Sequence, residues 1–490
     1  MQNHHLKLAI IGAGPAGLVS TRHLSQSPNL QITVFEANKD IGGLWVYDER
    51  TDADPKFDSQ KTQDPYYKLN GGYHSSMYTY LQSNLPYFYD AFKDLAHPDV
   101  DPNFPMYFNI HQQKQYLDAY AEKFGLRKYI QLNTLVQSVR LYENLTPEEQ
   151  SKAPEQRKFL VQTVKEDSIQ YHVFDYVLVA TGHHTKPYIP EIAGIEKFKG
   201  KILAAKDFKN PDAEYLKEKK VMILGSSFSA TDLAVQMLEN PYVGPQPVDK
   251  IMLVGRKLGF LGGSEDLKPF IERGKLSVFI GEIKQVLNEN TVELSDGTTR
   301  EVDTIIFATG YKFSFQFLDL EKDKFIDFDP NQSRGKFLGP IYKRFICIRE
   351  PDFFFVGNLD AAALSFSIFE IHAMIIKHII EGKIKLPSKE KMTESFLQDL
   401  DDLRHKHKMP MENTQLPPIM MDVPYWKEMK DWLAETYPSD EKKRQEFDDA
   451  MVKTYQQMGQ IFFSGNIISV KKFDYNTIFP RDLRNTTEFA

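Results

Sequence analysis

The sequence predicts an α/β fold with two doubly wound, dinucleotide-binding (Rossmann-like) domains, the smaller one inserted into the larger. Residues 8–25 and 221–237 each read as a buried strand, a glycine turn and a helix. Two further apolar runs, at residues 177–182 and 305–310, end in the same Ala-Thr-Gly sequence. A continuous apolar run of this kind is typical of a central parallel strand, and its final glycine lets the chain leave the strand close to a ligand.

The order of these units sets the expected domain boundaries. We expect the larger domain to span residues 1–187 and 310–490, ending in a helical tail, and the inserted domain to span residues 188–309. A chain of 490 residues is long enough for this arrangement. Within the larger domain we expect strands at residues 31–36, 130–139 and 353–357, helices at 113–124 and 366–380, and a charged loop at 147–155.

Composition excludes several classes of function. The 60 basic and 67 acidic residues give a net charge of −7, so the protein has no overall positive field to attract nucleic acid. One cysteine, Cys347, excludes an internal disulfide, a CxxC redox pair and a cysteine-based zinc site, and we expect no other metal site. The longest apolar stretches fall short of the roughly 20 residues of a membrane span. These features predict a cytoplasmic protein without a membrane span.

The first glycine turn carries the pattern of a dinucleotide site. Gly12 makes the turn, Gly14 lets the backbone approach a pyrophosphate, and Gly17 allows the helix to pack closely on the strand. Glu36 ends the next strand, where an acidic residue accepts hydrogen bonds from ribose hydroxyls and repels a 2′-phosphate. The pattern therefore favours FAD or NAD. The sequence Ile41-Gly-Gly-Leu-Trp45, which can line a flat ring system, favours FAD.

The second glycine turn is a looser version of the first. Gly225 makes the turn, Ser227 supplies a hydroxyl, and Ala230 replaces the packing glycine. The next strand ends in Arg256 instead of an acidic residue. A guanidinium binds a 2′-phosphate in bidentate fashion, so this position predicts a preference for NADPH.

Taken together, these motifs resemble the flavin-containing monooxygenases of the class B flavoprotein type. The resemblance covers most of the chain and is carried by GAGPAG at residues 12–17, GGLW at 42–45, HSSMYTYLQSN at 74–84, GSSFSA at 225–230 and FFFVGN at 353–358. The residues of these motifs are most similar to those of the bacterial trimethylamine-monooxygenase branch. One fingerprint differs: Phe198, Gly200 and Phe208 stand in place, but Ala204 occupies the position of the family's histidine.

The resemblance implies a role for each matching position. Asn84 is the implied catalytic residue, because a neutral amide donates and accepts hydrogen bonds without discharging a peroxide. Gln82 shares the place where the flavin and the nicotinamide meet. The residues implied to bind FAD are Gly12, Gly14, Pro15, Gly17, Glu36, Gly43, Leu44, Trp45, His74 and Val136. Those implied to bind NADPH are Tyr188, Gly225, Ser226, Ser227, Ser229 and Arg256, with Lys471 as a looser candidate from the tail.

The resemblance also implies a reaction. NADPH reduces the flavin, O2 adds to it as a C4a-hydroperoxide, and a small amine or sulfide takes the distal oxygen as N-oxide or S-oxide. Small residues at 361–364 are expected to widen the substrate pocket, and a homodimer is the general expectation for oligomeric state. His183 and His184 are interpreted as loop residues.

Two alternatives stay open at this point. One is Baeyer–Villiger oxidation of ketones, although its fingerprint normally ends in Trp where Phe208 stands. The other is an uncoupled NADPH oxidase or a flavin-binding protein, which Ala204 favours. A disulfide reductase is excluded because it needs paired cysteines.

Overall fold

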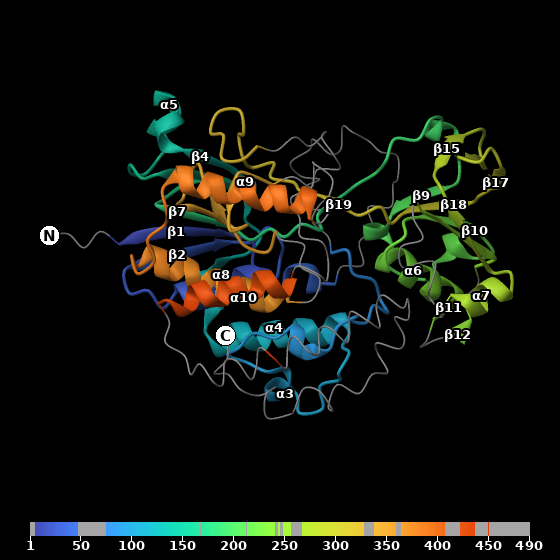
Figure 1. Ribbon diagram of the computed structural model, residues 1–490, viewed down its shortest axis with the longest axis horizontal. Helices are drawn as coiled ribbons and strands as arrows, with labels where there is room; N and C mark the ends of the chain where they lie inside the picture. The colour runs from blue at the N-terminus through green and yellow to red at the C-terminus, as the bar shows by residue number, and fades with distance from the viewer. Residues whose placement is uncertain are drawn as a thin grey trace.

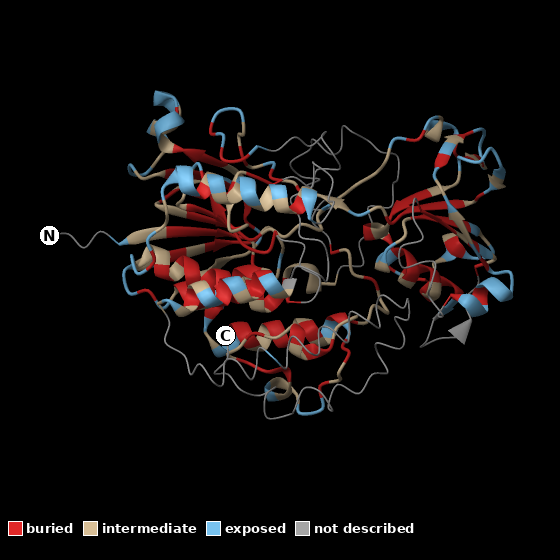
Figure 2. Cartoon of the chain, in the orientation of Figure 1, coloured by how far each residue is buried: buried red, intermediate tan, exposed pale blue. Residues whose placement is uncertain are grey.

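The computed structural model describes residues 5–47, 75–166, 168–211, 213–240, 244–245, 248–255, 267–327, 338–358, 364–406, 422–436 and 449. Figure 1 shows two α/β bodies side by side, one built around β1, β2 and β7 and the other around β9, β10 and β18. Each body has its own buried sheet, as the red strands in Figure 2 illustrate.

The larger body contains a seven-stranded sheet with the order β20-β21-β22-β7-β1-β2-β3. The strands from β22 to β3 in this order are parallel, whereas β21 and β20 form an antiparallel edge. The strand bounds are β1 (Leu6–Ile11), β2 (Leu30–Phe35), β3 (Ile130–Gln131), β7 (Tyr176–Val179), β20 (Ile341–Tyr342), β21 (Ile346–Cys347) and β22 (Phe353–Phe355).

The smaller body contains a five-stranded parallel sheet with the order β14-β13-β10-β18-β9. Its strands are β9 (Lys201–Ala204), β10 (Lys220–Leu224), β13 (Lys250–Gly255), β14 (Leu276–Ile280) and β18 (Thr304–Phe307). All five lie between the two chain segments that build the larger sheet. Both sheets are doubly wound around the strand that precedes a glycine turn, so the predicted fold class is confirmed.

Two short strands join the bodies. β8 (Lys186–Pro187) enters the smaller body, β19 (Tyr311–Lys312) leaves it, and the two pair with each other in antiparallel fashion. Tyr188 N also donates a hydrogen bond to Gly310 O at 2.8 Å. The chain therefore crosses out and back at one place. The domain boundaries at residues 187 and 309 stay a prediction, but these connecting strands lie beside them.

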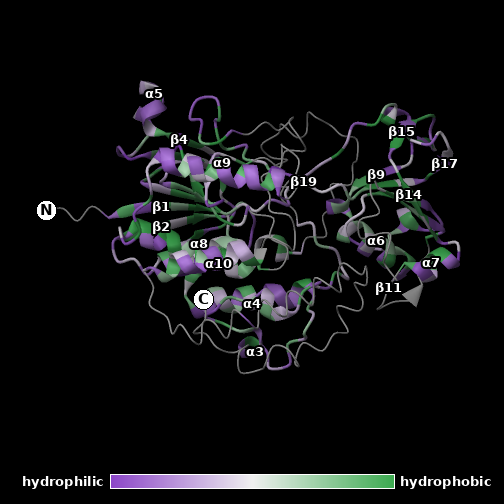
Figure 3. Cartoon of the chain, viewed as in Figure 1, coloured by the Kyte–Doolittle hydropathy of each residue, from purple (hydrophilic) through white to green (hydrophobic). Residues whose placement is uncertain are grey.

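Helices pack on one face of each sheet and turn their apolar sides inward (Figure 3), and a three-stranded antiparallel sheet packs on the other face. The helices of the larger body are α1 (Pro15–Leu24), α3 (His97–Val100), α4 (Ile110–Lys123), α5 (Pro147–Ser151), α8 (Ser365–Ile380), α9 (Lys389–His405) and α10 (Asp422–Ala434), and those of the smaller body are α6 (Phe228–Leu238) and α7 (Lys268–Glu272). Two three-stranded antiparallel sheets and a two-stranded one complete the described fold. They are β4 (Leu135–Leu141), β5 (Phe159–Lys165) and β6 (Ser168–Phe174); β15 (Ile283–Val286), β16 (Thr291–Leu294) and β17 (Thr299–Glu301); and β11 (Glu239–Asn240) with β12 (Gly244–Pro245). In the described part of the chain, no helix has the length and apolar character needed to cross a membrane.

Two local expectations were wrong. Residues 130–139 form not one strand but the whole of the two-residue strand β3 and the start of β4, which belong to different sheets. Asn133, with a φ of 52°, turns the chain between them. The charged loop at 147–155 begins as the short helix α5, because the Thr146 side chain accepts a hydrogen bond from Glu149 N and the Glu149 side chain accepts one from Thr146 N.

We predict that Gly17→Ala destabilises the fold. A Cβ atom at this position would lie 2.0 Å from Gly12 O, so either α1 or the glycine turn must shift. Overpacking of this kind costs about 1–3 kcal/mol of the free energy of unfolding, which denaturant titration of the apoprotein would measure. Gly125→Asn is the control, since its left-handed φ of 59° suits asparagine and no atom lies within 4 Å. Equal stability of Gly17→Ala and wild type would contradict the packing role.

Candidate active site

A cavity of about 650 Å³, which we call the first cavity, follows the carboxyl edge of the larger sheet. It begins at the turn between β1 and α1, where Gly12, Gly14 and Pro15 line it. Gly14 is the N-cap of α1 and no side chain caps this helix end, so the first amides of α1 face a space where a phosphate can bind. The cavity continues past Leu44 and Trp45 to the N-terminal end of α8.

Glu36 is buried at one end of the first cavity, next to Val136. Its carboxylate accepts hydrogen bonds from Ala13 N at 2.7 Å and from Asn38 N at 2.8 Å. Burial raises the pKa of Glu36 because desolvation outweighs these two bonds. A ribose hydroxyl that donated to this carboxylate would offset part of the desolvation, which suits the role expected for Glu36.

A second cavity of about 580 Å³ lies at the carboxyl edge of the smaller sheet. It is lined by the turn between β10 and α6, including Gly225, Ser226, Ser227 and Ser229, and by Tyr188 from the connecting segment. The close packing of this turn mirrors that of the first, because a Cβ at Gly225 would lie 2.3 Å from Ala308 O. Ser227 is the N-cap of α6, and its side chain makes no capping hydrogen bond.

The structure groups most of the predicted binding residues around these cavities. Gly17 instead packs under the first turn, against Gly12 O. Asn84 and Gln82 are half-buried and are absent from the linings of both cavities, and Gln82 Nε2 donates to Tyr107 O at 3.4 Å. Their roles at the flavin stay predictions. His74, Arg256, Lys471 and residues 361–363 lie outside the described residues.

His183 and His184 lie in a loop, as the sequence predicted, but sequence reasoning gave them no place at a cavity. These residues line both cavities and therefore mark the place where the two meet. Their rings lie 4.0 Å apart, and His184 packs edge-on against Tyr311 at 4.9 Å. The signal was present in the sequence: both follow an Ala-Thr-Gly strand end, which in a parallel sheet delivers the next residues to the ligand edge.

Ala204 sits at the end of β9 and is buried beside Phe307 in the sheet. The residues after it turn toward the second cavity, which Ala205 and Lys206 line. The buried Lys206 donates through Nζ to Thr185 O at 2.9 Å, and Lys209 donates to Ser75 O and Met77 O. In this chain, lysines therefore tie the fingerprint segment to the larger body.

Comparison with known proteins places this geometry in a family. The model of the flavin-binding monooxygenase-like family matches residues 5–243 and 264–417, which is more than half of the chain. The chain belongs to this family. Three similar proteins illustrate the relationship. A trimethylamine monooxygenase from Pelagibacter ubique (strain HTCC1002) is 30% identical over 395 residues, covering 78% of this chain and 76% of that one.

Two solved structures resemble this fold along nearly the whole chain. The structure of Tmm from Pelagibacter sp. strain HTCC7211 has a TM-score of 0.73 at 23% identity and covers 95% of this chain and 93% of that one. The structure of S-allyl-L-cysteine S-oxygenase from Allium sativum has a TM-score of 0.71 at 25% identity and covers 95% of this chain and 99% of that one. The first of these likenesses shows the fold alone.

The residues of the first cavity fit the flavin that this family binds. Thr181 lines the cavity, and its buried Oγ1 has no hydrogen-bond partner among the described residues. The first turn is closed to larger side chains, because a Cβ at Gly12 would lie 2.6 Å from Ala180 O. A polar atom without a partner and a backbone cradle are both features of a ligand site. Cys347 does not line this cavity, and burial raises the pKa of its thiol to about 12.

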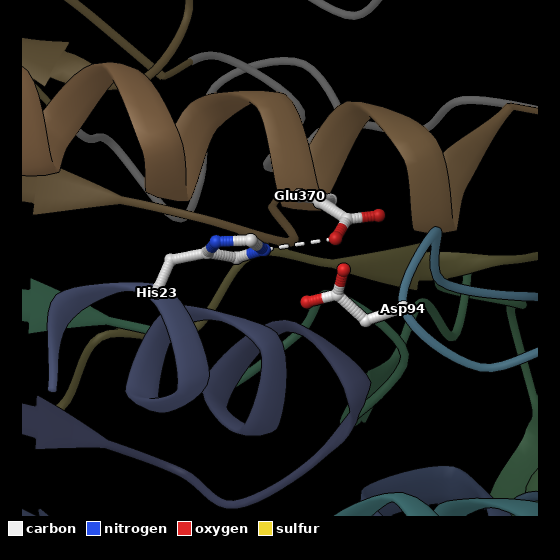
Figure 4. Close-up of side chains that lie close together, drawn as sticks. All are labelled: His23, Asp94 and Glu370. Atoms are coloured by element: carbon white, nitrogen blue, oxygen red, sulfur yellow. Dashed lines mark hydrogen bonds and ion pairs between the residues drawn. The ribbon is translucent and has the colours of Figure 1, made fainter. Parts of the chain in front are cut away.

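His23, Asp94 and Glu370 lie close enough together to hold a metal ion (Figure 4). Protein groups already bind their polar atoms, however. Glu370 accepts hydrogen bonds from His23 Nε2 and Lys93 N, each at 2.8 Å, and Asp94 lies 3.2 Å from the Arg22 guanidinium. The cluster joins α1, α8 and the segment between them in a buried network, and we interpret it as structural.

We predict that Glu370→Ala lowers the free energy of unfolding by about 3–5 kcal/mol, because it leaves the buried His23 and Lys93 N without their partner. Chemical denaturation of the apoprotein would measure this change. Glu122→Ala, on the exposed side of α4, is the control and should stay within about 0.5 kcal/mol of wild type. A chelator should leave the wild-type midpoint unchanged; a lowered midpoint would favour a metal site over a structural network.

Proposed function

We propose that this flavin-binding monooxygenase-like protein binds FAD in the first cavity and NADPH in the second, and uses O2 to oxygenate nitrogen or sulfur in small amines and sulfides. The supporting observation is that the two cavities share His183 and His184. Two dinucleotides bound along the two sheet edges would bring their reactive rings together there. The bound flavin would supply the redox chemistry and the activation of oxygen.

The chain's own residues would bind and orient these groups. The amides at the start of α1 would hold the pyrophosphate of FAD, and Glu36 would accept from its ribose. The serines at the start of α6 would hold the pyrophosphate of NADPH, with Tyr188 beside them and Arg256 selecting the 2′-phosphate. Trp45, which packs on Phe108 at 5.7 Å, would help to exclude water from the flavin ring.

The relatives support the proposed substrate class without fixing it. A trimethylamine monooxygenase and an S-oxygenase act, by their names, on an amine and on a sulfide. Both atoms are soft nucleophiles, so one oxygen-transfer site can serve either. The buried Ala204 keeps an uncoupled NADPH oxidase as the second candidate, because lysines and not the fingerprint histidine tie this segment to the larger body.

The decisive experiment measures oxygenated product formed per NADPH consumed. The purified protein should be yellow, and with a tertiary amine or a thioether it should form close to one N-oxide or S-oxide per NADPH. NADH should be a much poorer donor at equal concentration. Hydrogen peroxide in place of product, for every amine and sulfide tried, would favour the oxidase. Product from cyclic ketones alone would favour Baeyer–Villiger oxidation.

We predict that Asn84→Ala separates the two halves of the reaction. NADPH should still be oxidised at near the wild-type rate, because the cavities that bind the two dinucleotides remain intact. The product should fall about 5- to 150-fold, the equivalent of losing about 1–3 kcal/mol of hydrogen bonding, and hydrogen peroxide should replace it. Asn103→Ala, at an exposed position, is the control. Full product yield in Asn84→Ala would leave Asn84 as a scaffold residue.

A further inference from the structure

Asp90 is an acidic residue at the flavin site that neither the glycine motifs nor the proposed mechanism uses. It follows the short 3-10 helix η3 (Tyr87–Tyr89) and lines the first cavity. The same cavity is also lined by Leu44, Trp45, Ser75, Ser365, Phe366 and Phe369. Leu44 and Trp45 belong to the sequence that is expected to line the flavin ring.

The backbone of Asp90 is held firmly. Asp90 N donates to Tyr87 O at 3.0 Å, and the fully buried Gln113 of α4 donates through Nε2 to Asp90 O at 2.9 Å. Gln113 is itself fixed, because its Oε1 accepts a hydrogen bond from His97 Nε2 at 2.8 Å. Burial lowers the pKa of His97 to about 3, so this imidazole stays neutral. The backbone from which this carboxyl group extends is therefore held by a chain of uncharged hydrogen-bonding groups.

The carboxylate of Asp90 has no counter-charge among the described residues, and none of them donates a hydrogen bond to it. Neighbouring ionisable groups are engaged elsewhere. Tyr116 Oη donates to Leu95 O at 2.9 Å and accepts from Phe92 N at 2.8 Å, while Glu370 is bound by His23 and Lys93 N. Desolvation accordingly raises the pKa of Asp90 to about 7. Among the described residues, Asp94 pairs with Arg22, and His183 and His184 line the same cavity at its junction with the second.

We propose that Asp90 is the proton-accepting group of the flavin site, which binds one proton when the bound flavin is reduced and releases it when the flavin is reoxidised. The inference rests on the proposed binding of FAD in the first cavity. Two-electron reduction by hydride adds two electrons and one proton to the ring and leaves it with one negative charge. The carboxylate of Asp90 then takes one proton from solvent, so the net charge of the site does not change. Reoxidation removes two electrons from the ring, and the carboxyl group returns its proton to the reduced oxygen product or to solvent.

The proposal predicts how the midpoint potential of the flavin changes with pH. Above about pH 7 the carboxyl group is ionised beside oxidised flavin, so reduction takes up one extra proton. Below this pH it already holds the proton in both states. Each proton taken up with two electrons changes the midpoint potential by about 30 mV per pH unit. The flavin's own protonation contributes equally in a variant that lacks the carboxyl group.

The experiment measures the midpoint potential of the flavin in the full-length, flavin-loaded protein from about pH 6 to about pH 9, with a chemical reductant and reference dyes. Above about pH 7 the wild-type slope should be steeper than that of Asp90→Asn by about 30 mV per pH unit. Asp90→Glu should keep the steeper slope. Asp101→Asn, which removes a carboxylate outside both cavities, is the matched control and should match wild type.

Equal slopes for wild type and Asp90→Asn would overturn the proposal. If Asp90→Asn fails to bind flavin, the wild-type slope decides by itself, since about 30 mV per pH unit throughout leaves no proton for Asp90. The measurement needs neither NADPH nor a substrate. A protein that forms no oxygenated product but shows the steeper slope would refute the proposed function and support this inference, and the reverse pattern would do the opposite.

Discussion

The close approach of three backbone segments at each glycine turn is the constraint on which both binding sites depend. In the larger body β1 pairs with β7 so that Ile11 lies beside Val179, and in the smaller body Leu224 lies beside Phe307. Each register sets a glycine turn directly against the carbonyl of the neighbouring strand end, with no room for a Cβ atom. Helix starts and Ala-Thr-Gly strand ends therefore reach the same edge of the sheet, and the cavities form there.

The connection between the two bodies follows from the same arrangement. The Ala-Thr-Gly ends of β7 and β18 lead into β8 and β19, which pair with each other. The pairing holds the entry and exit of the smaller body together, and it places His183 and His184 where the two cavities adjoin. Lys206 and Lys209 add further contacts across the boundary, because their buried ammonium groups donate to carbonyls of the larger body. The same strand ends therefore lead to the binding edge and to the connection between the two bodies.

Some charged side chains inside the molecule pair with other protein groups, and these stabilise the fold. A charged side chain without a described partner is instead a candidate for a role in the chemistry. His23, Asp94 and Glu370 lie close together, and their hydrogen bonds and ion pairs are made with one another and with Lys93 and Arg22, so that they join α1 to α8. Asp90 lies nearby but faces a cavity without a described partner for its carboxylate. A partly exposed carboxyl group that is desolvated and has no described counter-charge retains its proton to higher pH, because its pKa is raised. Such a group belongs to a ligand site more naturally than to a packing interface.

The sequence by itself predicted the doubly wound fold, the glycine turns, and the position of Glu36 and the Ser226–Ser229 segment at the sheet edges. It could do so because strand periodicity and turn chemistry are local properties. It could not divide residues 130–139 between β3 and β4, since that choice depends on which sheet each half joins. It also gave no cavity position to His183 and His184 and did not single out Asp90. The environment of Asp90 is set by η3, α4 and α8, which are far apart in the chain. Only the tertiary structure decides which side chains face a shared cavity and which polar groups find partners, because both depend on contacts between distant segments.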